Sequence, residues 1–528
     1  MPSKSKVKNP ELSIVVTAHA EGIIAHKTMR CVSENQKLLD ENHISSEIIV
    51  HIDAGTKETK DYFKRYQDTP GIRIFENNFR DLGKSRNFAN KMAKGEYVAF
   101  IDADDLISSN WLLSAYQIIK NNKHAVLVHP EAVLDFGINV TCPRLWIQKS
   151  SKSSKIENAQ NLIVTNRWVS TIAGPKQIFL DFPYPPTEHG FGNEDYEFNL
   201  ATISAGISHL VAPKTILFYR QKPSGSLLSQ SALEKYVQRF SPLFDVNFYR
   251  ENYQPPLEPP KPTVKEKTTK EKAVEKYVSL RNHHPIINKV ITPAATFAKK
   301  ITGKTIAPVT TALSPEEEKK KQIPSFVLKE WKEISQIDAN VCPNDALLNN
   351  LWFYRPEENA AYSEAYYELV KNIRELPEYI FIISDNIERT ISSRIEKLRP
   401  KTKVTIITTD IDNFKAEYLP PNAALIEFGR ATNGMEEFGK DYLLSQLLIQ
   451  LGCKKIHLIN SDFGYRWVMS HQTLVKDNFE LDVSVLANNI NPCLAEIYPL
   501  VHRVFTDNSE TANHLSESDG FELKKFAY

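Results

Sequence analysis

Residues 96–106 read EYVAFIDADDL, an apolar run that ends in three carboxylates, Asp102, Asp104 and Asp105. Short apolar runs bounded by polar turns are typical of strands that are buried on both faces of a parallel sheet. Carboxylates crowded at the end of such a strand repel one another, and they lose hydration when they are partly buried. The arrangement therefore needs a cation, a set of hydrogen-bond donors or water to offset the repulsion.

This stretch is one of several apolar runs that alternate with helix-like segments over residues 11–250. The others include LSIVVTAH (12–19), SEIIVHID (46–53) and IRIFEN (72–77). The alternation predicts an α/β fold with parallel strands, in which ligands bind at the carboxyl ends of the strands near a topological switch. Asp53 and Asp102 both lie at such a strand end.

Composition and charge narrow the class of protein. The 528 residues are too many for one compact core and predict two or three domains. A net charge of +1 does not indicate a nucleic-acid partner, because proteins that bind nucleic acids usually carry an excess of basic residues. The five cysteines lack CxxC spacing and read as reduced thiols of a cytosolic protein. The apolar run LSIVV is too short for a signal peptide, and no run approaches the ~20 residues of a membrane span.

The composition divides the chain into three parts. Residues 1–250 form the first α/β domain. Residues 251–324 are rich in Pro and then in Lys and Glu, which predicts a linker. Within it, residues 283–304 can form an amphipathic helix, either at a membrane surface or against a neighbouring domain. Residues 325–528 again alternate strands and helices, and predict a second Rossmann-like domain.

The acidic cluster has two readings. Asp102 and Asp104 can hold Mg²⁺ or Mn²⁺ together with a substrate diphosphate, because these ions prefer oxygen ligands. Alternatively the cluster is an acidic loop in which Asp105 caps the following helix. Upstream, Arg86 at the start of a helix can reach a diphosphate through its planar fork, or it can be a solvated charge.

A second pair of acids, Glu194 and Asp195, opens an amphipathic helix. A carboxylate there can accept a proton from a bound hydroxyl, or it can stabilise the helix N-terminus. Further along, HLVAPKTILFYRQKPSGSLLSQ (209–230) supplies His209, Tyr219, Arg220 and Ser226.

Taken in order, these motifs resemble glycosyltransferase family 2, a GT-A fold with one nucleotide-sugar site, over residues 11–245. They are TAHAEG (17–22), HIDAGT (51–56), GKSRN (83–87), FIDADD (100–105), GFGNEDYEF (190–198) and YR…GSLLS (219–229). The resemblance implies a metal-dependent transferase that inverts the anomeric centre in a single displacement. It also implies roles for individual residues.

On the donor side, the resemblance implies that Ala18 and Glu21 border the nucleotide pocket. Asp53 is expected to hydrogen-bond the base, most often uracil, and Arg86 to lie beside the nucleotide. Asp102 and Asp104 are expected to hold the ribose and the Mn²⁺–diphosphate or Mg²⁺–diphosphate group.

On the acceptor side, Asp195 is the expected general base, and Glu194 is expected to help place the acceptor. The third metal ligand in GT-A enzymes is often a histidine, for which His209 and His189 are the candidates. Trp168 could stack on a sugar ring or belong to the core.

The second predicted sheet resembles the first Rossmann half of a GT-B glycosyltransferase of the family 4 kind. A GT-B enzyme needs a second half, which does not follow here. The module is then a truncated piece of a two-enzyme polypeptide, an acceptor-binding or docking domain, or a generic Rossmann-like packing domain.

The expected function is transfer of a sugar from a nucleotide-diphosphate donor, a UDP-sugar, to a saccharide or lipid-linked acceptor during capsule or O-antigen synthesis. We expect a cytoplasmic protein, with peripheral contact to the membrane or to other polysaccharide-assembly proteins, and no nucleic-acid partner. One alternative is a catalytically silent scaffold or polysaccharide-binding protein. Another is a sugar nucleotidyltransferase, although TAHAEGIIAHKT (17–28) lacks the Gly-rich loop of that class.

Overall fold

The computed structural model describes most of the two predicted domains. The described residues are 9–222, 235–255, 323–342, 347–348, 350–354, 360–384, 389–399, 402–410, 419–421, 423–485, 490–506 and 508–527. The predicted linker and its amphipathic helix therefore lie almost wholly outside the described residues, as does Ser226. The described residues up to 253 and those from 325 onward group into one compact unit.

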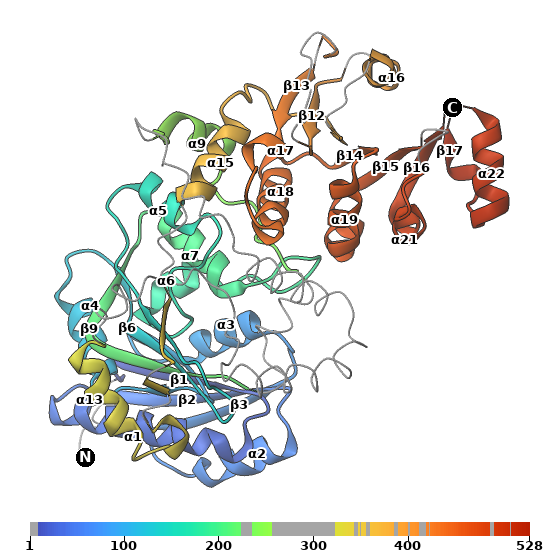
Figure 1. Cartoon of the computed structure of the whole chain (residues 1–528). Helices are drawn as coiled ribbons and strands as arrows, with labels where there is room; N and C mark the ends of the chain where they lie inside the picture. The colour runs from blue at the N-terminus through green and yellow to red at the C-terminus, as the bar shows by residue number, and fades with distance from the viewer. Residues whose placement is uncertain are drawn as a thin grey trace, which may run out of the picture. The chain divides into compact units, whose positions relative to one another are not determined.

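The first domain is built on a mixed sheet (Figure 1). Its spatial order is β10-β7-β6-β8-β4-β1-β2-β3, and β9 joins β5 and β6 beside this path. The strands β1 to β4 pair in parallel, whereas β8 is antiparallel to β4 and β6. The strand bounds are β1 Leu12–Ala18, β2 Ser46–Asp53, β3 Ile72–Asn77, β4 Tyr97–Asp102, β5 Leu106–Ile107, β6 Val126–Phe136, β7 Arg144–Ile147, β8 Ile172–Pro175, β9 Ser208–Arg220 and β10 Trp352–Tyr354.

Helices cover both faces of the parallel part of this sheet, with α1 and α2 on one side and α3 on the other (Figure 1). Several of them begin at a polar cap, such as Thr56 before α2 and Asp81 before α3. In the part of the chain that the structure describes, no helix is both long enough and apolar enough to span a bilayer. The bounds are α1 Ala25–Glu41, α2 Lys57–Phe63, α3 Leu82–Met92, α4 Trp111–Asn121, α5 Lys155–Leu162, α6 Lys176–Asp181, α7 Glu194–Ser204, α9 Val246–Asn252 and α13 Ser325–Ile334.

The core beneath the site packs β1, β2 and β4 against α3, α6 and α7. It includes Val15, Ile49, Phe100, Phe179 and Phe198, each 5% exposed or less. Burying side chains of this size on both faces of the sheet supplies the main driving force for folding. The core thus fixes the strand ends on which the acidic residues lie.

Strand order places the acidic turn at a topological switch. The chain runs from β1 outward through β2 to β3, then returns to β4 on the other side of β1. Thr17 of β1 and Asp102 of β4 are register partners at this point. Ligand sites of open α/β sheets lie where the strand order reverses, outside the carboxyl ends of the strands. The sequence prediction for this part of the fold is confirmed.

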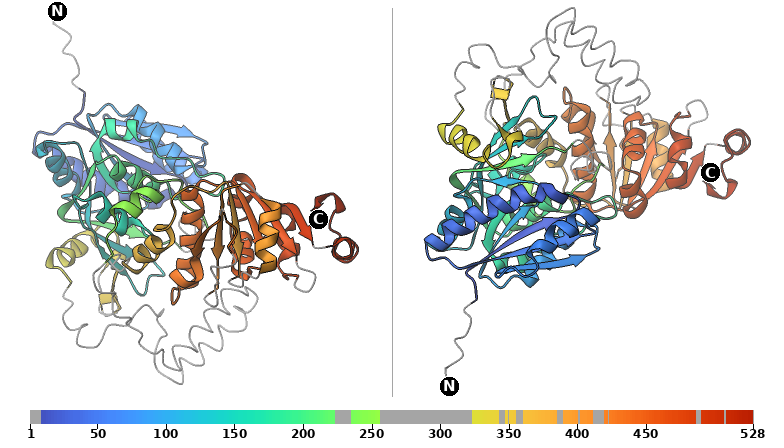
Figure 2. Two further views of the ribbon diagram at one scale, coloured as in Figure 1. Left: turned by 90° about the horizontal axis from the view of Figure 1, so that it is seen from above. Right: turned by 90° about the horizontal axis from the view of Figure 1, so that it is seen from below.

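The second domain is a parallel sheet of order β13-β12-β11-β14-β15-β16-β17. Helices lie on both of its sides (Figure 2). This is the doubly wound order expected of a Rossmann-like domain. The strands are β11 Tyr379–Ile383, β12 Val404–Thr408, β13 Ala423–Glu427, β14 Lys455–Ile459, β15 Glu480–Val485, β16 Val501–Thr506 and β17 Phe526–Ala527. The helices are α15 Ala360–Val370, α16 Arg389–Leu398, α17 Phe428–Ala431, α18 Glu437–Leu451, α19 Asp462–Ser470, α20 Gln472–Asn478, α21 Leu494–Ile497 and α22 Ser509–Asp519.

Residues 325–354 belong with the first sheet. The strand β10 pairs in parallel with β7, and α13 packs against β9. A buried ion pair joins Arg220 at the end of β9 to Asp338, with 2.8 Å between Nη2 and Oδ2. We therefore propose that the second domain begins between residues 354 and 360, later than the boundary at 325 that composition suggests.

Candidate active site

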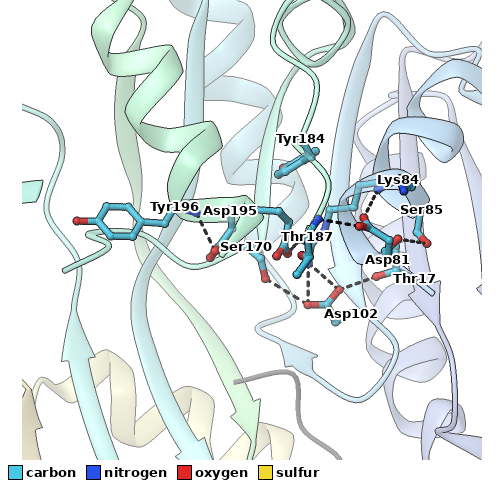
Figure 3. Close-up of polar contacts among 12 residues, drawn as sticks. Thr17, Asp81, Lys84, Ser85, Asp102, Ser170, Tyr184, Thr187, Asp195 and Tyr196 are labelled. Atoms are coloured by element: carbon cyan, nitrogen blue, oxygen red, sulfur yellow. Dashed lines mark hydrogen bonds and ion pairs between the residues drawn. The ribbon is translucent and has the colours of Figure 1, made fainter. Parts of the chain in front are cut away.

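Asp102 ends β4 and accepts hydrogen bonds from three different elements. Thr17 Oγ1 lies 2.5 Å away and Ser170 Oγ 3.2 Å (Figure 3). Arg86 Nη2 lies 3.1 Å away. Burial alone would raise the pKa of Asp102, but the Arg86 charge and the donated hydrogen bonds outweigh it and lower the pKa. Asp102 is therefore a firmly ionised carboxylate, held by donors of this chain.

Arg86 bridges the strand end to the acidic helix α7. Its side chain is 1% exposed and lies on α3, with Nη1 2.7 Å from Glu194 Oε1. Its guanidinium carbon lies 5.4 Å from the centre of the Tyr184 ring. A buried arginine between two carboxylates is stable only because both charges compensate it. The structure thus brings together three of the predicted site residues, Arg86, Asp102 and Glu194.

Asp195 is the second residue of α7, and the N-cap residue Asn193, with a left-handed φ of 63°, turns the chain into this helix. Asn166 Nδ2 donates to Asp195 Oδ2 at 3.0 Å, and the Tyr196 amide donates to Oδ1 at 2.8 Å. Burial and the adjacent Glu194 charge raise the pKa of Asp195 to about 7. A carboxylate with a pKa near neutrality is suited to accept and release a proton.

Asn166 is a residue that sequence reasoning did not single out. Its Oδ1 accepts a 2.8 Å hydrogen bond from Asn199 Nδ2, which orients the amide so that its nitrogen faces Asp195. A lone asparagine in a loop carries no sequence pattern that reveals this contact. The loop that contains it, residues 165–171, also supplies Ser170 to Asp102.

Asp53 lies at the end of β2 as expected, but its carboxylate is occupied. Oδ1 accepts from the amides of Phe79 and Arg80, and Oδ2 accepts from the Asp81 amide and Ser85 Oγ, all at 2.6–3.0 Å. Four donors fill the acceptor sites of one carboxylate. In this structure Asp53 holds the loop before α3, and it is not free to accept from a base.

The loop before α7 is fastened to α3. The Asp81 carboxylate caps α3 through the Lys84 amide and accepts from the Thr187 amide, each at 2.8 Å (Figure 3). Asn87 exchanges two hydrogen bonds with the backbone of Tyr184, at 2.7 and 2.9 Å. Together with the ion pairs of Arg86 to Asp102 and Glu194, these contacts join α3, the loop before α7 and the end of β4.

Asp104 and Glu21 face a lysine. Lys222 Nζ lies 2.8 Å from Asp104 Oδ2 and 3.1 Å from Glu21 Oε1. The second oxygen of Glu21 accepts from the His19 amide at 2.5 Å, next to the buried Ala18 at the end of β1. Glu21 and Asp104 therefore lie close together, and their roles in donor binding stay predictions. Lys222 was missed, because no local pattern distinguishes it from a surface lysine.

The helix-capping role considered for Asp105 is wrong. The N-cap residue of α4 is Asn110, and in its first turn the Leu112 amide donates to Asn35 Oδ1 at 3.0 Å, not to Asp105. Asp105 is 1% exposed and accepts from the Arg220 amide at 2.8 Å. Arg220 also donates Nε to the Asp104 carbonyl at 2.8 Å. Both contacts join the acidic turn to the end of β9.

The two histidines considered as metal ligands have other partners. His209 is fully buried, with Nδ1 2.9 Å from His129 Nε2 and Nε2 2.8 Å from Thr202 Oγ1. Trp168 stacks on His209 with ring centres 4.4 Å apart and is itself 2% exposed, so it is a core tryptophan. His189 lies in the loop before α7, where Nδ1 is 2.9 Å from Asp477 Oδ2.

The residues present do not fit a divalent cation in this arrangement. Asp102 is engaged by Arg86, Thr17 and Ser170, Asp104 is engaged by Lys222, and both nitrogens of His209 are hydrogen-bonded. Among the described residues, no group of three or more His, Cys, Asp or Glu side chains is placed to hold a metal ion. The Mn²⁺ or Mg²⁺ expected from the sequence remains a prediction.

Comparison with known proteins agrees with this geometry. Residues 13–175 match the family model described as glycosyl transferase family 2. A stretch of 84 residues is 33% identical to poly(ribitol-phosphate) beta-N-acetylglucosaminyltransferase TarS of Staphylococcus aureus, and covers 16% of this chain and 15% of that protein. A stretch of 70 residues is 36% identical to UDP-Glc:alpha-D-GlcNAc-diphosphoundecaprenol beta-1,3-glucosyltransferase WfaP of Escherichia coli, and covers 13% of this chain and 28% of that protein. The chain thus spans less than a third of the length of either relative.

Two solved structures are also similar. S. aureus TarS 1–349 in complex with UDP-GlcNAc is 16% identical with a TM-score of 0.32, over 46% of this chain and 65% of that chain. The mannosyltransferase PcManGT of Pyrobaculum calidifontis, in complex with GDP-Man and Mn²⁺, is 16% identical with a TM-score of 0.33, over 63% and 86%.

The strand order and the acidic turn at the switch point define an α/β domain of the GT-A type. With the family match, residues 13–175 form a glycosyltransferase family 2 domain.

Proposed function

We propose that this chain transfers a sugar from a nucleotide-diphosphate donor, a UDP-sugar, to a hydroxyl of a saccharide or lipid-linked acceptor in cell-surface polysaccharide synthesis. The observation that supports this most directly is Asp195. Its pKa is raised to about 7, and it lies next to Glu194, which the buried Arg86 joins to Asp102. The names of the relatives TarS and WfaP support the classes of donor and acceptor.

The proposed reaction is a single displacement. The acceptor hydroxyl attacks the anomeric carbon from the face opposite the nucleotide, and Asp195 takes the proton of that hydroxyl. A new carbon–oxygen bond forms as the bond between the anomeric carbon and the diphosphate oxygen breaks. The electron pair of the broken bond leaves with the nucleoside diphosphate, so the anomeric configuration is inverted. Fixed donors stabilise this step because they need no reorganisation as charge develops.

Other side chains have positioning roles in this proposal. Asn166 orients Asp195, and Arg86 holds Glu194 and Asp102 at a fixed separation between acceptor and donor sides. Asp53 shapes the donor pocket through the loop that precedes α3. The proposed reaction uses only groups of this chain, because the carboxylates and the histidine predicted to bind Mn²⁺ or Mg²⁺ are already engaged by other side chains.

The second sheet is proposed to bind the acceptor or to dock to other polysaccharide-assembly proteins. A cytoplasmic location with peripheral contact to the membrane remains a prediction, which fractionation of cells expressing the chain would test. The capsule or O-antigen context also remains a prediction.

The test is a transfer assay over a panel of UDP-, GDP- and dTDP-sugars, run with Mn²⁺ and with EDTA. The wild-type chain is expected to release nucleoside diphosphate from at least one donor. Asp195→Asn is expected to lose roughly 10²–10⁴-fold in rate, the usual contribution of a general base. Asp68→Asn, an exposed acid in the turn before β3, is the matched control and should keep full activity. Full activity of Asp195→Asn, or no turnover of any donor, would contradict the proposal.

A further inference from the structure

Lys222 lies where the carboxylates of the donor side converge. Its Nζ is within 3.1 Å of oxygens from both Glu21 and Asp104, which come from separate strand ends. The three side chains are 26%, 7% and 16% exposed, so the ion pairs are largely shielded from water. One ammonium thus offsets the repulsion between Glu21 and Asp104, much as the sequence prediction had a divalent ion offset the repulsion between Asp102 and Asp104.

The charge state of this group follows from its contacts. Burial alone would lower the pKa of Lys222, but the charges of Asp104 and Glu21 outweigh it and raise the pKa. Burial raises the pKa of Asp104, and the ammonium opposes that rise. With only 2.8 Å between Nζ and Oδ2, we take both groups to be ionised.

Lys222 is also held at a defined place. Two residues before it, Arg220 donates its amide to Asp105, its Nε to the Asp104 carbonyl and its Nη2 to Asp338. The end of β9 is thereby tied to the acidic turn, and Lys222 follows directly. An ammonium has three N–H donors, and the two carboxylates use two of them, so one donor remains that neither carboxylate takes.

We propose that the Lys222 ammonium is the resident cation of the donor site. It lies between Glu21 and Asp104, supplies the positive charge that the sequence assigned to a divalent ion at Asp102 and Asp104, and binds the diphosphate of the nucleotide donor through its remaining N–H. The proposal rests on the proposed function, since it presupposes a nucleotide-diphosphate ligand. It predicts that nucleotide binding does not require a metal ion.

The test is calorimetric titration of the full chain with UDP, and separately with GDP, in EDTA and in Mn²⁺. The wild-type chain is expected to bind one of them in EDTA, with an affinity that Mn²⁺ changes by less than about threefold. Lys222→Met keeps an unbranched side chain, one atom shorter, but removes the charge, and should weaken binding in EDTA by about tenfold or more, as expected for loss of a charged donor.

Two further variants keep the test decisive. Lys222→Arg restores a cation and should recover binding to within about threefold of wild type, whereas a residue needed only for folding would not be rescued by charge. Lys91→Met, at an exposed position on α3, should bind like wild type.

The outcomes separate the two proposals. Binding by the wild-type chain only in Mn²⁺, or undiminished binding by Lys222→Met in EDTA, overturns the role of Lys222 and leaves the proposed function standing. Absence of UDP and GDP binding under both conditions overturns both proposals.

Discussion

At the scale of single residues, Asp53 shows how one carboxylate can organise a loop. Asp53→Ala removes the acceptor of the buried Asp81 amide and Ser85 Oγ, and leaves both of these donors unsatisfied. We expect it to lower the free energy of unfolding by roughly 2–4 kcal/mol at pH 7. Urea denaturation measures this, and Asp61→Asn at an exposed position is the control.

The effect of pH on Asp53→Ala has a defined sign. Burial raises the pKa of Asp53, but the donated hydrogen bonds outweigh it, so the pKa is lower in the folded chain than in the unfolded chain. The carboxylate therefore stabilises the fold above the ordinary carboxyl pKa of about 3.9, and this stabilisation is lost as the pH falls below it. The difference between wild type and Asp53→Ala should shrink toward pH 3. A difference that is equal at pH 3 and pH 7 would contradict this account.

The motif order predicted that Asp102, Arg86, Glu194 and Asp195 belong to one site, and the structure places Arg86 in contact with Asp102 and Glu194. The sequence could not predict which hydrogen-bond and ion-pair partners each of these side chains has. Lys222 depends on where β9 ends relative to the acidic turn, a long-range relation that no local spacing encodes. For the same reason Asp53 appeared to be available for a base, although four donors of its own chain fill it.

At the scale of elements, the packing of α3 against the loop before α7 depends on Gly83. A Cβ at this position would lie 2.7 Å from the Pro185 carbonyl oxygen and 3.3 Å from Tyr184 Cβ. In an exposed helix Gly→Ala stabilises by up to about 1 kcal/mol, but here the clash with backbone reverses the sign. We expect Gly83→Ala to destabilise by roughly 1–3 kcal/mol.

Thermal unfolding measures the effect of Gly83→Ala. Lys84→Ala changes an exposed neighbour in the same helical turn and is the control. Because the loop carries the chain into α7, Gly83→Ala should also reduce the rate of sugar transfer. A Gly83→Ala chain that is more stable than wild type would show that the loop does not pack on α3 as described.

Elements with strong periodicity were predictable, and edge elements were not. The apolar runs at 12–18, 46–53 and 97–102 became strands because their side chains are buried on both faces of the sheet. The three-residue strand β10 carries too little pattern to be recognised, and it pairs with β7, which is far away in sequence. The sequence prediction therefore relied on composition and placed the start of the second domain at residue 325.

At the scale of the whole molecule, the ion pair between Arg220 and Asp338 ties the segment after the linker to the first sheet. The two side chains are 8% and 5% exposed. Asp338→Ala leaves Arg220 buried without its charge partner, and should cost about 3–5 kcal/mol. Glu333→Ala, whose side chain is 47% exposed, is the control. Equal urea midpoints for Asp338→Ala and wild type would contradict the attachment of residues 325–354 to the first domain.

The most direct test of the central claim is the pH dependence of the transfer rate, kcat/KM, in wild type and Asp195→Asn. The base must be deprotonated to accept the hydroxyl proton, and the pKa of Asp195 is raised to about 7. The account predicts a wild-type rate that falls about tenfold per pH unit below about 7, and a residual rate in Asp195→Asn that lacks this dependence. A wild-type rate that stays flat down to pH 5, or the same pH profile in Asp195→Asn, would contradict the assignment of Asp195 as the general base.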